Sequence, residues 1–152
     1  MAVTYPRLNQ MQLTERALGP NEQNLVLATW IKAFRTSPYA GCLPNHVSTS
    51  ILTRCIVDLL DAGATLRGVF DEYDNCLGWV CEDLTEDSTP VIHYIYTRPR
   101  QSEASLAEVR ASLVPASGGI YTYRTKDITD FLGFHWKHRP GIARARSNKH
   151  EQ

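Results

Sequence analysis

The sequence lacks the patterns that mark a metal centre or a membrane span. Its four cysteines (Cys42, Cys55, Cys76 and Cys81) show no C-x-x-C spacing and have no partnering cluster of histidines, so we expect no zinc site. There is no secretory signal peptide and no apolar run close to the ~18 residues that a membrane helix needs. We therefore expect a protein of the reducing cytoplasm with no membrane contact, in which Cys55 and Cys81 are small core residues.

The sequence also lacks a net charge, because 16 basic and 16 acidic residues balance, so no overall field draws the chain towards nucleic acid. The charges are unevenly placed, however. Residues 71–87 hold seven acids and no Lys or Arg, whereas residues 137–149 hold five Lys or Arg and no acid. Such runs are typically solvated, but the basic one has a second interpretation as a weak nucleic-acid contact. Its cations are Lys137, Arg139, Arg144, Arg146 and Lys149.

One run without glycine or formal charge, Val91–Thr97, has the β-branched and aromatic composition of a central strand. Arg98-Pro99 ends the run, because proline has no amide hydrogen to give a strand ladder. We predict that the rest of the fold is arranged around this strand.

A helix and a further strand follow it. The spacing of apolar residues predicts a helix over 103–113 with Ser102 as its cap, and Ile120–Tyr123 has the composition of a strand. Strand, helix and strand together predict a βαβ crossover with parallel strands over residues 91–124. Ligands bind such units where the first strand passes into the helix, so the sequence predicts a ligand site at residues 96–105.

The other periodic segments predict helices and a hairpin on either side of this unit, with Trp30 in the core. They are an edge strand or extended arm at Met11–Leu13, a helix from Pro20 to Arg35 capped by Asn21, a helix over 46–61 capped by Asn45, hairpin strands over 65–73 and 77–84, a helix ending at Leu132 and a strand over 134–137. Glycines inside the hairpin strands, Gly68 and Gly78, predict bulges or close backbone approach. The predicted organisation is an arm or edge strand (1–19), one domain (20–136) and a basic polar tail (137–152).

This order of elements resembles that of the GNAT superfamily of acyl-CoA-dependent N-acetyltransferases, over residues 24–136. The early helix Ala28–Arg35 with its tryptophan, the strand start Leu77-Gly78-Trp79-Val80 and the strand Val91–Tyr96 look most like the small GNAT-like proteins of tailed bacteriophages, and Phe131–Phe134 resembles the Leu-Gly-Phe of the last GNAT helix. The resemblance implies an α+β fold with a mixed, twisted sheet of about six strands and helices on both faces.

The resemblance also implies a place for acetyl-CoA. In the family, the backbone of a bulged fourth strand pairs with the pantetheine arm, and amides at the start of the next helix hold the diphosphate. The residues at the matching positions are Ile95, Tyr96 and Thr97 for the arm and Arg98, Arg100, Gln101 and Ser102 for the phosphates.

Two departures from the family pattern affect this site. Where the family has a glycine and then a small residue, this chain has Glu103 and Ser105, so we expect bulk and negative charge where a diphosphate would lie. The tyrosine that serves as general acid in many members is replaced by Thr129. The catalytic residue is therefore unknown, and the candidates are Glu82, His93, Tyr96 and Thr129. The first three have an alternative role as ordinary strand residues, and the hydroxyl of Thr129 is a far poorer acid than a phenol.

Two functions follow from these residues. We favour a GNAT-like bacteriophage protein that is catalytically degenerate, needs no cofactor and contacts other virion or host proteins, as a homo-oligomer or alone. It would reside in the virion or the host cytoplasm. The alternative is an active acyl-CoA-dependent N-acetyltransferase that acetylates an amine of a host or phage molecule.

Overall fold

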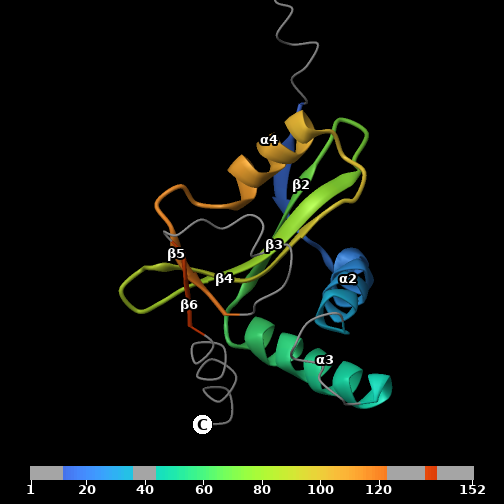
Figure 1. Cartoon of the computed structure of the whole chain (residues 1–152), viewed down its shortest axis with the longest axis vertical. Helices are drawn as coiled ribbons and strands as arrows, with labels where there is room; N and C mark the ends of the chain where they lie inside the picture. The colour runs from blue at the N-terminus through green and yellow to red at the C-terminus, as the bar shows by residue number, and fades with distance from the viewer. Residues whose placement is uncertain (1–11, 36–43, 123–135, 140–152) are drawn as a thin grey trace, which may run out of the picture.

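The computed structural model describes residues 12–35, 44–122 and 136–139 (Figure 1). The elements along the chain are β1 (Thr14–Ala17), a 3-10 turn η1 (Pro20–Glu22), α2 (Gln23–Arg35), α3 (Asn45–Asp61), β2 (Thr65–Phe70), β3 (Cys76–Leu84), β4 (Pro90–Thr97), α4 (Glu103–Leu113), β5 (Gly119–Tyr121) and β6 (Trp136–His138). Within these described segments, no helix combines the length and the apolar character needed to cross a membrane.

The strands form one sheet in the order β1-β2-β3-β4-β5-β6. The first three pairings are antiparallel, whereas β4 with β5 and β5 with β6 are parallel. The predicted α+β class and mixed six-stranded sheet are therefore confirmed, and so is the βαβ crossover that β4, α4 and β5 form.

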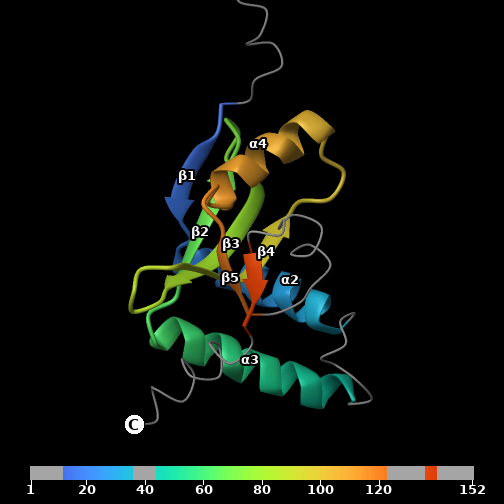
Figure 2. The same ribbon diagram turned by 60° about the vertical axis from the view of Figure 1, so that its left-hand side comes forward.

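Helices cover both faces of this sheet, as predicted. In Figures 1 and 2, α4 lies on one side and α2 with α3 on the other. The first core lies under α2 and α3, where Trp30 stacks on Tyr94 with ring centroids 5.2 Å apart and tilts against Trp79 at 6.1 Å. Cys81 is fully buried in this core, whereas Cys55 is only half-buried. The second core joins Val109 and other residues of α4 to the opposite face.

A bulge interrupts β4 at His93. Cys81 of β3 pairs with Tyr94, and the next residue, Glu82, pairs with Ile92, so His93 has no counterpart on β3. The extra residue reverses the alternation of faces, which places Ile92 and Ile95 on the same side, in the core under α4. The bulge thus lies in the middle of β4, ahead of the strand's C-terminal end.

The edge strand lies further along the chain than predicted, at Thr14–Ala17 rather than at Met11–Leu13. Its residues are mostly exposed and polar, as is common at a sheet edge, so the sequence gives little strand signal there. Arg16 holds the strand in place, since its guanidinium lies 3.7 Å from the centre of the Phe70 ring and 2.7 Å from the Glu22 carboxylate.

Several predicted boundaries also need correction. Asn45 is the first residue of α3 and not its cap, because Pro44 takes the cap position without a side-chain hydrogen bond. Strand β2 ends at Phe70, before the predicted Tyr73, since the Asp71 carboxylate accepts hydrogen bonds from the backbone of Tyr73 and Asn75 and closes the turn. The last strand lies at 136–138, and the predicted helix ending at Leu132 falls outside the described residues.

Candidate functional site at the start of helix α4

A hollow of ≈ 780 Å³ opens where β4 passes into α4. This is the place at which the sequence predicts a ligand site. The residues around it are Leu77, Tyr96, Arg98, Pro99, Arg100, Gln101, Ser102 and Ser105. Tyr96, Arg98, Arg100, Gln101 and Ser102 were expected here, whereas Leu77 comes from the neighbouring strand β3 and carries no signal in the local sequence.

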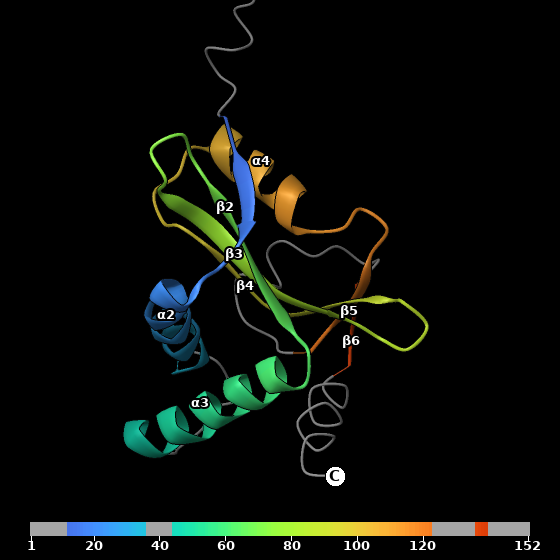
Figure 3. The ribbon, with the colours of Figure 1, turned by 180° about the vertical axis from the view of Figure 1, so that it is seen from behind.

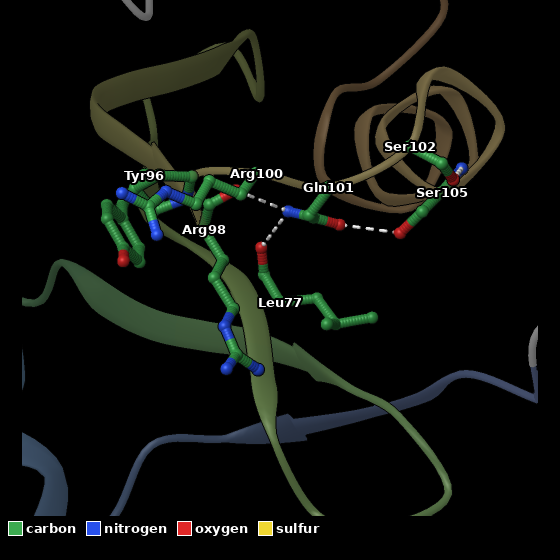
Figure 4. A pocket seen from close by; sticks show the side chains of 8 residues that line it. Leu77, Tyr96, Arg98, Arg100, Gln101, Ser102 and Ser105 are labelled. Atoms are coloured by element: carbon green, nitrogen blue, oxygen red, sulfur yellow. Dashed lines mark hydrogen bonds between the residues drawn. The ribbon is translucent and has the colours of Figure 1, made fainter.

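The turn between β4 and α4 is held by Gln101. Its side-chain amide donates to the carbonyl of Leu77 at 2.8 Å and to that of Arg98 at 3.0 Å, and its carbonyl accepts from the Ser105 hydroxyl at 2.6 Å (Figure 4). Arg100 adopts a left-handed backbone conformation, with φ of 66°, where the chain reverses. Gln101 therefore stabilises the turn through its side-chain amide. The cationic side chains of the turn are Arg98 and Arg100.

Helix α4 directs its amino end towards this turn. The Ser102 hydroxyl accepts from the Ser105 amide at 3.1 Å, so the predicted cap is confirmed. The amides of Glu103 and Ala104 have no acceptor among the described residues. Free amides at a helix start carry partial positive charge and favour an anion.

Both arginines of the turn are exposed. Asp71, in the turn between β2 and β3, is affected by the charge of Arg98. Hydrogen bonds from Asn75 are the main cause that lowers the pKa of Asp71, and the guanidinium of Arg98 adds a smaller effect in the same direction. The turn thus combines two exposed guanidinium groups with two unbonded amides, which makes it a basic surface in a chain with no net charge.

Glu103 lies in the first turn of α4 with an exposed side chain, and it does not line the hollow. Its side chain is thus not among the residues that line the hollow, and the expectation that it hinders a diphosphate stays a prediction. The negative charge remains nearby, and it also stabilises the amino end of α4 itself.

Among the described residues, the C-terminal half of β4 has an open edge, an outward side to which no strand is paired. The amide of Arg98 donates to the carbonyl of Leu77 at 2.8 Å, so by the alternation of a strand the backbone groups of Ile95 and Thr97 point away from β3. Pairing with β5 ends earlier, where the Thr122 amide donates to the Ile92 carbonyl at 3.1 Å. Within the described segments, the outward edge at Ile95 and Thr97 has no strand partner, and in Figures 1 and 3 this half of β4 extends away from β5.

These positions refine the predicted arm-binding residues. Ile95 and Thr97 present backbone groups to the open edge, whereas Tyr96 directs its own towards β3 and can contribute only its side chain, which lines the hollow. The side chain of Ile95 is fully buried under α4.

Two of the catalytic candidates have structural partners. Glu82 forms a two-point ion pair with Arg67, with distances of 2.8 and 3.1 Å. This hydrogen-bonded carboxylate raises the pKa of Arg67. Arg67 also donates to the carbonyls of Ser112 and Leu113 at the end of α4, so Glu82 helps to anchor that helix.

His93 is fully buried at the bulge of β4. Its Nδ1 lies 2.8 Å from the Thr122 hydroxyl, and its Nε2 lies 3.7 Å from an oxygen of Asp83. Because the imidazole has no exposed surface, a substrate amine cannot reach it. Tyr96 is partly buried and packs against Trp79 at 6.2 Å, while Thr129 lies outside the described residues.

The predicted nucleic-acid contact is described only in part. Lys137 is exposed in β6, and the backbone amide of Arg139 donates to the carbonyl of Tyr121 at 2.9 Å. The other three cations, Arg144, Arg146 and Lys149, lie outside the described residues. A nucleic-acid role for this segment stays a prediction.

No protein-family model matches the chain, and no curated protein does. Among solved structures, it is similar to a possible acetyltransferase from Clostridium difficile 630, at 8% identity and a TM-score of 0.46 over 86% of this chain and 80% of that one. It is also similar to an acetyltransferase of the GNAT family from Staphylococcus aureus MU50, at 8% identity and a TM-score of 0.38 over 66% and 65% of the two chains. A third is a probable acetyltransferase, at 12% identity and a TM-score of 0.37 over 91% and 88%. These likenesses assign no residue of this chain a role.

Proposed function

We propose that the protein binds a coenzyme A thioester and transfers its acyl group to an amine. The observation that carries this proposal is the meeting of two features at one place. The outward edge of β4 at Ile95 and Thr97 leads directly to a turn with two exposed arginines and the unbonded amides of α4. An extended arm that ends in a diphosphate matches both features, because amide-bearing arms pair with strand edges and phosphates bind helix starts.

The charges of the turn fit such a ligand. Two unit charges about 4 Å apart attract by about 1 kcal/mol at an effective dielectric of ~80 and by about 4 kcal/mol at ~20. Arg98 and Arg100 supply two such attractions, and the amides of Glu103 and Ala104 add partial charges, whereas the Glu103 carboxylate opposes them once. The balance favours an anion.

When bound, the thioester supplies an activated acyl group. The contribution of the chain would be to hold that group in place, since Glu82 is paired with Arg67 and His93 is buried. Positioning alone lowers a reaction barrier substantially. The neutral amine would attack the thioester carbonyl, the C–S bond would break, and the proton lost by the amine would end on the departing CoA thiolate.

The same engaged side chains favour a second candidate function, a GNAT-like scaffold that has lost catalysis. In this version the protein is a component of a bacteriophage virion or contacts a host protein. Mass spectrometry of purified particles would reveal a virion component. A titration in which acetyl-CoA does not bind at millimolar concentration would also favour the scaffold over the enzyme.

Removing the arginine charges should weaken cofactor binding. We expect Arg98→Gln and Arg100→Gln each to raise the dissociation constant of acetyl-CoA about tenfold, and the double variant about a hundredfold, since each loses a charge-assisted contact to a phosphate. Isothermal titration calorimetry at low salt measures this change. Arg54→Gln removes an exposed charge on α3, away from the hollow, and should leave the affinity unaltered. Equal affinities for the double variant and the parent protein would refute the assignment.

A further inference from the structure

The strands β4 and β5 part at a buried cluster of polar side chains. Their last shared backbone bond runs from the Thr122 amide to the Ile92 carbonyl, at 3.1 Å. Directly beside it, Nδ1 of His93 lies 2.8 Å from the Thr122 hydroxyl. The two side chains come from positions 29 residues apart and join the strands at the point beyond which β4 has its open edge.

The bulge explains how His93 reaches Thr122. Because His93 has no counterpart on β3, it lies outside the normal alternation of β4. On the other side of the imidazole ring, Nε2 lies 3.7 Å from Oδ2 of Asp83 in β3, and this nitrogen has no hydrogen-bond partner among the described residues. The bond to Thr122 is therefore the one hydrogen bond that the imidazole makes within the described structure.

We propose that the bond between His93 and Thr122 is a pin, a contact that fixes where β4 and β5 separate and so positions the outward edge at Ile95 and Thr97 for the thioester arm. This inference rests on the proposed function and adds two positioning residues to it. Neither residue touches the ligand, since both side chains are buried, with relative exposures of 0% and 1%. They act through the backbone of β4 between the bulge and Thr97.

Burial makes this bond matter for the geometry. A buried polar group that loses its partner is costly, so the two side chains stay together and hold their strands with them. Without the Thr122 hydroxyl, the imidazole has no hydrogen-bond partner among the described residues, and β4 can shift relative to β5. The turn with Arg98 and Arg100 lies beyond the end of β4, and Gln101 holds it independently.

The test compares two ligands on matched variants. Thr122→Val removes the hydroxyl with little change in shape, and we expect it to raise the dissociation constant of acetyl-CoA about tenfold. The nucleotide fragment of CoA, which lacks the pantetheine arm, should bind the variant and the parent protein within about twofold, since it needs only the basic turn. Thr122→Ser keeps the hydroxyl and should restore the affinity for acetyl-CoA.

The calorimetric titrations test separately the role of the bond between His93 and Thr122 and the proposed binding of acetyl-CoA. A folded Thr122→Val that binds acetyl-CoA as well as the parent protein overturns the pin, and so does an equal loss for both ligands, because that marks a general structural effect. A parent protein that does not bind acetyl-CoA at millimolar concentration overturns the proposed function itself. Should Thr122→Val fail to fold, Thr122→Ala and Thr122→Ser differ only in the hydroxyl and are compared in the same way.

Discussion

Replacing Gly78 with alanine is expected to lower the free energy of unfolding by about 2–3 kcal/mol. A Cβ at this position would lie 2.8 Å from the backbone carbonyl oxygen of Tyr96, 2.9 Å from Val109 and 3.1 Å from Leu113. The last two belong to α4, which thus packs directly on the glycine. Since the carbonyl belongs to the paired strand β4, it cannot move aside cheaply, and α4 must move away from the sheet. The predicted close backbone approach at this glycine is therefore confirmed.

The measurement is a urea titration of Gly78→Ala and of the parent protein, with circular dichroism as the signal for unfolding. Gly19→Ala is the matched control, because a Cβ there meets only a Glu22 oxygen at 3.8 Å, and it should leave stability almost unchanged. Because α4 supplies one wall of the hollow, the Gly78 variant should also bind acetyl-CoA more weakly than the parent protein. A Gly78→Ala protein as stable as the control would show that α4 does not pack on β3 in the described way.

The replacement of Trp30 by alanine should have the largest effect on stability, a loss of about 3–5 kcal/mol. Trp30 is 1% exposed and connects α2 to the sheet by stacking on Tyr94, with Trp79 close by. Truncation removes these aromatic contacts and leaves a cavity that the rigid sheet cannot fill.

Leu25→Ala tests the same helix without a cavity, since Leu25 is 37% exposed, and it should change stability by less than about 1 kcal/mol. Thermal unfolding of the two variants and the parent protein measures the difference. If both variants lost equal stability, the aromatic core under α2 would not be the main contact of that helix.

The crossover from β4 through α4 to β5 was predictable because its signals are local. Pro99 ends a strand, Ser102 caps the helix that follows, and each signal acts within a few residues. This order of elements also predicts a ligand site at residues 96–105, and a hollow lies at that place; that a ligand binds there stays a prediction.

The internal geometry of the site was not predictable, because it depends on residues far apart in the chain. In the sequence, Gln101 looks like a contact to a phosphate. In the structure, its side-chain amide donates to the carbonyl of Leu77, 24 residues away, and stabilises the turn. From the sequence, Glu82 is a candidate general base, whereas in the structure its carboxylate is paired with Arg67 of the neighbouring strand. Sequence periodicity gives no register between strands, so it shows neither of these partners.

Hydrogen–deuterium exchange with and without acetyl-CoA reports both whether the ligand binds and which residues it covers. We expect saturating acetyl-CoA to slow exchange at the outward amides of Ile95 and Thr97 and at the unbonded amides of Glu103 and Ala104. Amides on the far side of α3 should exchange at an unchanged rate. Unaltered exchange throughout β4 and α4 at millimolar acetyl-CoA would show that this turn and strand edge do not bind the thioester, and so would protection confined to another part of the molecule.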